Sequence, residues 1–214
     1  MEQEIIERIL ERFAGGDYVD EVKSARDSFF GQLKDLREDD PSFERLTGCF
    51  LNWYVFDRPM DSGLGTPAQV FAASDEISSE DHEMLAAMVG NIHALFEVLR
   101  IDEGFTQLKD LFTTEILKVT ERRSLAGLDP GDILEARLLP LGGKLVFSTG
   151  AYLLHPRPAR GLIIAAIDKC RRAGQPSSQQ MISKLQALSF RFSDRFQQRV
   201  PVDKVYGELE TFTG

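Results

Sequence analysis

Apolar residues in the first ninety positions recur at intervals of three and four, the period of amphipathic helices. The first apolar stripe consists of Ile5, Ile6, Ile9, Leu10 and Phe13. Gly15-Gly16 ends it, and a second stripe runs from Tyr18 to Leu36. A third segment, residues 43–56, is so dense in apolar residues that we expect it to be buried on most sides. Two shorter helices are expected to begin at Thr66-Pro67 and near Ser78.

The pattern changes near residue 91, where short apolar runs bounded by turn residues predict strands. The expected strands are Leu95–Ile101, Phe105–Phe112, Ile116–Glu121, Asp132–Leu139 and Lys144–Leu154. Gly142-Gly143 joins two of these runs and is typical of a tight hairpin. In the fourth run, Leu134, Ala136 and Leu138 alternate with Ile133, Glu135, Arg137 and Leu139. Five antiparallel strands of this length predict a small barrel or curled sheet, and SH3-like and OB-like topologies both fit.

Helical spacing returns after His155-Pro156. We expect a helix over 159–173, a longer one from Ser177 or Ser178 to about Gln198, and a short one after Pro201. The long helix carries an apolar stripe made of Met181, Leu185, Leu188, Phe192 and Phe196. This stripe packs inside the monomer or, if exposed, forms a homodimer or binds a partner helix.

The expected fold class is therefore α+β, with three regions along the chain. An acidic helical region covers 1–90, the small five-stranded β-unit covers 91–157, and a C-terminal helical region covers 158–214.

The net charge of −9 is unevenly distributed along the chain. Residues 1–90 hold twenty acidic and eight basic residues, 91–160 hold nine of each, and 161–214 hold five and eight. The acidic and basic ends either attract each other, within one molecule or between two, or simply keep the protein in solution. The overall acidity argues against non-specific nucleic-acid binding, which needs a concentrated basic face.

Several features favour a cytoplasmic protein without a membrane anchor. No apolar run approaches the ~18 residues of a membrane span. The acidic N-terminus, Met1 to Glu4, is unlike a signal peptide. Cys49 and Cys170 are too few for a disulfide framework, so we expect each to be a small buried apolar residue.

No stretch of the chain carries an established catalytic motif. His82, His93 and His155 have no metal-ligand spacing, and C-x-x-C is absent, so we expect no metal and no cofactor. Gly63–Ala68 matches G-x-G-x-x-A, but it follows a predicted helix and Pro67 lacks an amide hydrogen. We interpret it as a loop and helix cap.

Two groups of residues are candidates for a binding or catalytic site. Asp57, Arg58 and Asp61, with His82, border the loop after the third helix, where an enzyme site could lie. Asp57-Arg58 could equally form an ion pair or cap at a helix end. The second group consists of Arg122, Arg123 and Arg137 in the β-unit, among Phe105, Phe112 and Phe147. Basic and aromatic residues on a small barrel are typical of single-stranded nucleic-acid binding, but acidic residues are interleaved here.

Five segments in one order resemble a poorly characterised group of bacterial proteins. They are Phe50–Asp57, Gly65–Pro67, Leu95–Val98, Leu108–Leu111 and Gly131–Leu138. The resemblance covers about residues 43–155, and some members of that group also carry a C-terminal SEC-C zinc motif. It implies no activity. With two cysteines this chain has no SEC-C metal site, so zinc is not transferred to it.

The sequence is compatible with three classes of function. A non-catalytic protein-interaction or regulatory module with an unidentified protein partner comes first, because no coherent active site is visible. A nucleic-acid-associated protein that uses the β-unit is the alternative. An enzyme with a site near residues 57–67 is the second alternative.

Overall fold

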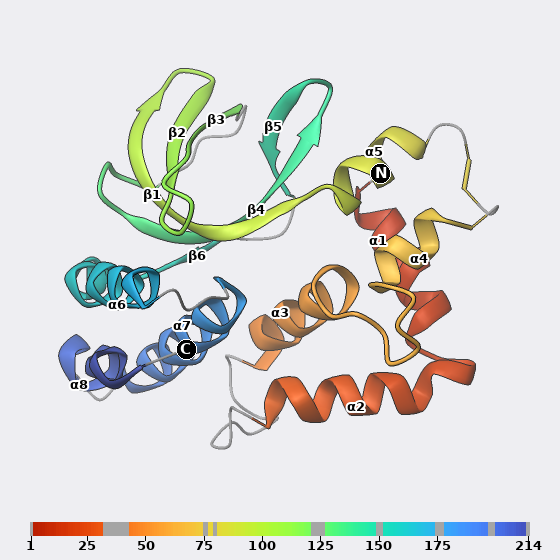
Figure 1. The fold of residues 1–214 in the computed structure, drawn as a ribbon, viewed down its shortest axis with the longest axis horizontal. Helices are drawn as coiled ribbons and strands as arrows, with labels where there is room; N and C mark the ends of the chain where they lie inside the picture. The colour runs from red at the N-terminus through yellow and green to blue at the C-terminus, as the bar shows by residue number, and fades with distance from the viewer. Residues whose placement is uncertain are drawn as a thin grey trace. The chain divides into compact units, whose positions relative to one another are not determined.

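The computed structural model describes residues 2–31, 43–74, 77–78, 81–120, 127–148, 152–173, 178–196 and 200–212. In these residues the chain is an α+β protein, with N-terminal helices, a mixed sheet of six strands and C-terminal helices (Figure 1). It divides into two compact units, Met1–Asn91 and Ile92–Gly214.

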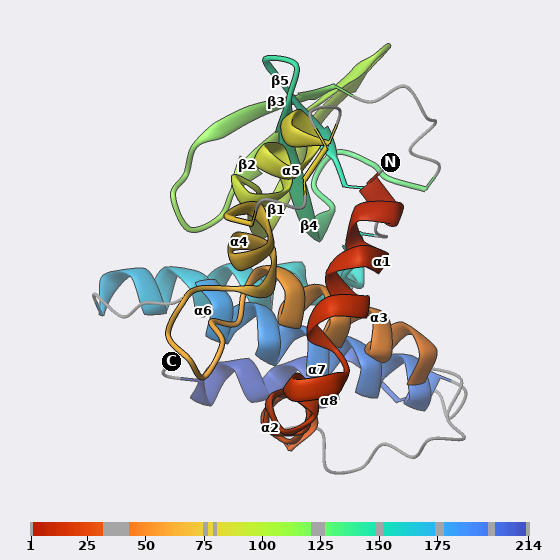
Figure 2. The same cartoon turned by 90° about the vertical axis from the view of Figure 1, so that its right-hand side faces the viewer.

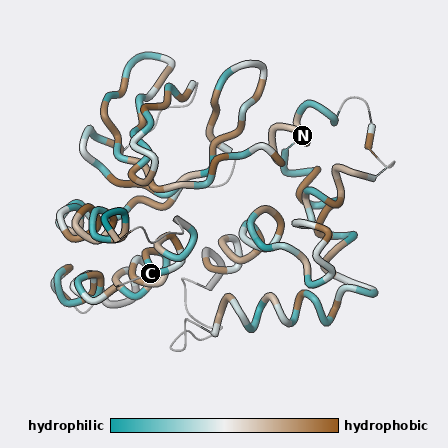
Figure 3. The backbone as a smooth tube through the Cα atoms, in the orientation of Figure 1, coloured by the Kyte–Doolittle hydropathy of each residue, from teal (hydrophilic) through white to brown (hydrophobic). Residues whose placement is uncertain are grey.

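The first unit is helical. Its elements are α1 (Glu2–Phe13), the 3₁₀ turn η1 (Gly16–Tyr18), α2 (Val19–Phe30), α3 (Phe43–Phe56), α4 (Pro67–Ala72) and α5 (His82–Val89). The predicted stripe of α1 is confirmed, because Ile5, Ile9 and Phe13 are fully buried. Figure 3 shows hydrophobic and hydrophilic residues alternating around the turns of α2. That helix ends at Phe30, and most of its expected continuation to Leu36 lies outside the described residues.

Aromatic side chains join α2 to α3. The ring centroid of Phe29 lies 5.6 Å from that of Phe50 and 5.4 Å from that of Trp53. Edge-on and tilted aromatic pairs at this spacing add to the stabilisation from burial. The burial expected from the apolar density of residues 43–56 is confirmed at Leu46, Phe50 and Tyr54.

The expected cap at Thr66 is confirmed. The Gln69 amide donates to Thr66 Oγ1 at 3.3 Å, and Gln69 Oε1 accepts from the Thr66 amide at 3.0 Å, which together make a capping box. Pro67 follows at the first helical position. The glycine-containing loop is thus a helix cap that follows a helix, as interpreted from the sequence.

The second unit is built on the sheet. Its strands are β1 (Ile92–Asp102), β2 (Phe105–Asp110), β3 (Ile116–Thr120), β4 (Ile133–Leu141), β5 (Lys144–Phe147) and β6 (Leu153–Leu154). Pairing runs β1–β2–β3–β5–β4 and returns from β4 to β1, with β6 beside β4. Gly142 and Gly143 have φ values of 57° and 71°, as the expected tight hairpin requires.

Two details of the expected β-unit are wrong. β3 and β5 are parallel, so the sheet is mixed rather than antiparallel. The fifth expected strand, Lys144–Leu154, is two strands, β5 and β6, which both pair antiparallel with the edge of β4 opposite β1. From Leu138↔Phe147 to Glu135↔Leu153 the pairing advances three residues on β4 but six on the other side, so β5 and β6 are not one regular strand.

The strand order distinguishes the two topologies left open by the sequence. A circuit of five strands closed by a short parallel pair between the third and fifth is the order of the OB-fold, a partly open Greek-key barrel. The parallel pair joins only Val119 to Leu145 and Thr120 to Val146, so the sheet is curled and not a closed barrel.

The sheet has an inner and an outer face, as the alternation in β4 predicted. The inner side chains form one apolar core, which includes Phe96, Leu108, Val119, Leu134 and Leu138. On the other face, Leu95 and Ile133 share a second core with the C-terminal helices.

The C-terminal elements are η2 (Arg157–Ala159), α6 (Arg160–Arg172), α7 (Ser178–Phe196), α8 (Val202–Tyr206) and η3 (Gly207–Thr211). In Figures 1 and 2, α6, α7 and α8 lie on one side of the sheet, away from the tips of its hairpins. Met181, Leu185 and Leu188 of the α7 stripe are buried in the second core, so they pack within the monomer. A homodimer stays an untested prediction.

Candidate functional site

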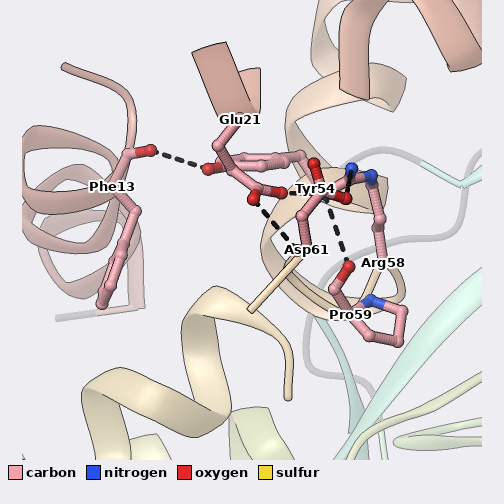
Figure 4. Close-up of polar contacts among 6 residues, drawn as sticks. All are labelled: Phe13, Glu21, Tyr54, Arg58, Pro59 and Asp61. Atoms are coloured by element: carbon pink, nitrogen blue, oxygen red, sulfur yellow. Dashed lines mark hydrogen bonds and ion pairs between the residues drawn. The ribbon is translucent and has the colours of Figure 1, made fainter. Parts of the chain in front are cut away.

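The loop candidates of the first unit form a compact ion-pair cluster (Figure 4). The Arg58 guanidinium is paired with Glu21 of α2, and its Nη2 lies 2.7 Å from Asp61 Oδ1. The Asp61 amide donates to Glu21 Oε2 at 3.0 Å. The side chains of Arg58 and Glu21 are 11% and 10% exposed, whereas that of Asp61 is 60% exposed. The cluster ties the loop after α3 to α2.

The other two loop candidates are Asp57 and His82. The amide of Asp57 donates to the carbonyl of Trp53 at the end of α3. His82 is exposed at the start of α5. Because Glu21, Arg58 and Asp61 bond to one another, they form the structural alternative, an ion pair at a helix end.

Tyr54 lies beside this cluster and is also engaged in the fold. Its hydroxyl donates to the carbonyl oxygen of Phe13 at 2.7 Å. Burial raises the pKa of Tyr54 to about 12, and the Glu21 carboxylate adds to this shift. The phenol is therefore neutral at physiological pH and acts as a hydrogen-bond donor within the first unit.

Of the three arginine candidates, Arg137 alone lies in the described residues. Arg122 and Arg123 lie outside those residues. Arg137 is a buried residue of β4, and its Nη2 lies 3.2 Å from His93 Nδ1. Of the aromatic residues expected near them, Phe147 is in the inner core and Phe112 packs against the other core.

A buried polar cluster lies between the sheet and α7. Glu135 Oε1 accepts from Gln186 Nε2 at 2.7 Å and lies 2.9 Å from His93 Nε2. Nearby, His155 Nδ1 lies 3.3 Å from the Tyr206 hydroxyl. Burial lowers the pKa of His155 to about 4, against the opposing effect of the Glu135 charge. Because Glu135, Gln186 and His155 are all enclosed, we assign this cluster to the fold.

A different surface combines exposure with binding chemistry. We call it the outer β2–β3 face, and it consists of Phe105, Gln107, Lys109, Ile116, Lys118 and Thr120. The alternate residues of both strands, such as Leu108 and Val119, point into the inner core. Ile116 is 60% exposed, although isoleucine is usually buried.

A cation and an aromatic ring are in contact on this face. Lys118 Nζ lies 4.1 Å from the centroid of the Phe105 ring. Gln107 is in register with Lys118 on one side and with Arg100 of β1 on the other. Arg100 is itself paired with Asp102, Nε to Oδ2 at 2.7 Å. A row of two cations and an amide thus crosses three strands next to an aromatic ring.

Comparison with known proteins gives a family. A family model described as a family of unknown function (DUF7986) matches residues 3–186. The chain belongs to DUF7986. The resemblance to a poorly characterised protein group is thereby confirmed at that level. No curated protein and no solved structure matches the chain.

Two further findings concern the parts of this DUF7986 protein that the structure describes. There, no group of three or more His, Cys, Asp or Glu side chains could hold a metal ion. No helix there is long and apolar enough to cross a membrane.

Sequence reasoning named Phe105 but missed the rest of the surface that this DUF7986 protein exposes on β2 and β3. It selected arginines by residue type, and Arg137 proved to be buried. The useful signal was the alternation in the β2–β3 hairpin, where Phe105, Gln107 and Lys109 occupy one set of alternate positions and Ile116 and Lys118 the matching set. A set of alternate positions shares one face of a strand, so these residues had to lie together.

Proposed function

We propose that the β-unit binds single-stranded nucleic acid on the outer β2–β3 face and catalyses no reaction. The observation that carries this proposal is the exposed contact of Lys118 with Phe105 beside the Arg100–Gln107–Lys118 row. Small barrels of OB-like order use the surface of their second and third strands to bind oligonucleotides.

The physical basis is stacking combined with charge. A base stacked on an aromatic side chain is stabilised by ~1–3 kcal/mol whatever its sequence. Lysines and arginines beside the ring neutralise phosphates and release counterions, which makes binding sensitive to salt. The acidic first ninety residues oppose any general attraction to polyanions. We therefore expect moderate affinity that depends on the face itself.

Fluorescence anisotropy with labelled oligothymidylate of about 12 nucleotides, within the ~4–16 nucleotides that one OB-fold covers, tests the proposal. Phe105→Leu keeps an apolar side chain but removes the ring, and affinity should fall about 5- to 100-fold. Lys204→Gln is the matched control, because it removes an exposed lysine of α8 in the same unit. It should leave affinity within about twofold.

The contrary outcome is equally definite. Absence of binding at low salt, or binding that Phe105→Leu leaves unchanged, would exclude this surface as a nucleic-acid site. Affinity purification at two salt concentrations with nuclease treatment then tests the protein-interaction alternative. A stoichiometric protein partner that survives both conditions would support a regulatory module.

The setting of this function is also a proposal. The five segments that resemble a bacterial protein group, and a chain with only two cysteines, support the bacterial cytoplasm. Kinship with proteins that carry a C-terminal SEC-C motif rests on the same five segments. An enzyme site near residues 57–67 stays a prediction. The mutual pairing of Arg58, Glu21 and Asp61 gives it no additional support.

A further inference from the structure

We infer that Lys118 is a positioning residue that moves from the Phe105 ring to a phosphate when a base stacks on that ring. The inference rests on the proposed function and adds a specific exchange of partners at the same surface.

The register explains why this lysine reaches this ring. Phe105 is directly opposite Thr120, and Gln107 is directly opposite Lys118, so Phe105 and Lys118 are diagonal neighbours on one face. Diagonal neighbours of an antiparallel pair lie within reach of long side chains. The lysine folds across the strands, and its Nζ comes to rest over the ring at 4.1 Å from the centroid.

In that position the ammonium occupies the surface that a base needs. Stacking requires contact between two flat faces, and a cation 4.1 Å above the ring centre lies in the space between them. A base therefore has to displace the ammonium. An exposed cation–π contact is weaker than the stacking of a base on an aromatic ring, so the exchange is favourable.

The displaced ammonium stays close to the bound strand. Lys118 is exposed, its side chain is long and flexible, and successive residues on one face of a strand lie roughly 7 Å apart. A phosphate that flanks the stacked base is therefore within its reach. Arg100 differs in the free protein, because its guanidinium already pairs with Asp102.

NMR of the full chain tests the exchange directly. In the free protein the ring current of Phe105 should shift the Lys118 ε-methylene protons upfield, and Phe105→Leu should remove that shift. Saturating oligothymidylate should also remove it from the unsubstituted protein. If the upfield shift is absent in the free protein, or persists in the complex, the inference is wrong.

Salt dependence gives a second, independent readout. Lys118→Gln removes both the obstacle and the phosphate contact. The variant should bind oligothymidylate more weakly than the unsubstituted protein at low salt, release about one ion fewer, and bind equally well or better at high salt. Lys109→Gln is the control on the same face, in register with Ile116, and it should bind more weakly at low salt with no gain at high salt.

The outcomes separate the two proposals. Two results would overturn the exchange and leave the nucleic-acid site intact, provided that binding depends on Phe105. One is a Lys118 ε-methylene shift that oligothymidylate does not change. The other is an affinity of Lys118→Gln that does not approach that of the unsubstituted protein at high salt. Failure of every oligonucleotide to bind would overturn both.

Discussion

Tyr54 of α3 donates its hydroxyl hydrogen to the carbonyl oxygen of Phe13 at 2.7 Å. Phe13 is the last residue of α1, and the final carbonyls of a helix have no partner within the helix. Tyr54 therefore caps α1 from a helix that begins thirty residues later in the chain. Both side chains are fully buried, so water cannot substitute for this hydroxyl without rearrangement.

Tyr54→Phe should lower the free energy of unfolding by about 1–2 kcal/mol, because it leaves a buried carbonyl without its donor while keeping the ring. Urea denaturation should show a lower midpoint with an unchanged m-value. Tyr18→Phe is the matched control. Its ring also contacts Phe13, with centroids 5.1 Å apart, but its hydroxyl makes no hydrogen bond to the described residues. A loss of stability in the control equal to that of Tyr54→Phe would contradict the capping role.

The same hydroxyl predicts an alkaline loss of stability. Burial raises the pKa of Tyr54 from 10.0 to about 12, so the folded state holds the phenolic proton more tightly than the unfolded state. The resulting stabilisation is complete below pH 10 and disappears as the pH rises from 10 to about 12. The difference in unfolding free energy between the unsubstituted protein and Tyr54→Phe should therefore shrink across this range. Burial also raises the pKa of Tyr206, but Tyr206 is present in both proteins and cancels.

In the ion-pair cluster, substitution of the buried Arg58 and of the exposed Asp61 should lower the free energy of unfolding by unequal amounts. Arg58→Met should lower the free energy of unfolding by about 3 kcal/mol, because it leaves Glu21 nearly buried without a counter-charge. Asp61→Asn should cost less than about 1 kcal/mol, since that carboxylate is 60% exposed and its pair is screened by water. Chemical denaturation of both variants checks the order. Equal losses would mean that the exposed pair contributes as much as the buried one.

His155 predicts a loss of stability in mild acid. Burial lowers its pKa from 6.5 to about 4, so the folded state disfavours the protonated form. The stabilisation is complete above pH 6.5 and is lost as the pH falls from 6.5 towards 4, by up to about 3 kcal/mol. His155→Phe should be less stable at pH 7, because it loses the Tyr206 contact, but should show a smaller decline over that range. His82→Gln, at an exposed site on α5, should decline like the unsubstituted protein.

Local patterns predicted most elements, and long-range pairing accounts for what they missed. The helical stripes, the Thr66 cap and the Gly142-Gly143 hairpin all depend on residues close together in the chain. The parallel pairing of β3 with β5 joins Val119 to Leu145, across a segment whose path no local period determines. The separation of β5 from β6 has the same origin, because it depends on the register in which each strand pairs with β4.

The candidate residues show the same contrast between local patterns and long-range contacts. An ion pair at a helix end was foreseen for Arg58, but its partner Glu21 lies 37 positions earlier and nothing local indicated it. The alternation in the fourth run placed Glu135 on the same face as Ile133 and Arg137. Its burial could not be predicted, because the compensating donor Gln186 comes from α7, 51 positions later. The alternation in the β2–β3 hairpin is visible in the sequence, and it would have placed Phe105 and Lys118 together on one exposed face.

Glu208 predicts a second acid transition, separate from that of His155. It accepts from Lys184 Nζ at 2.7 Å and is paired with the Arg191 guanidinium. The Arg191 contact is the main cause that lowers its pKa from 4.5 to about 2. The folded state therefore favours the ionised form, and the stabilisation present above pH 4.5 is lost as the pH falls towards 2. Glu208→Gln should remove part of the decline between pH 4.5 and 2 and leave the His155 decline above it unchanged. Glu210→Gln, two positions along the same 3₁₀ segment, is the control, since its backbone carbonyl rather than its side chain accepts from Lys169. If Glu208→Gln and Glu210→Gln lose stability in parallel below pH 4.5, the pairing with Arg191 and Lys184 does not stabilise the second unit.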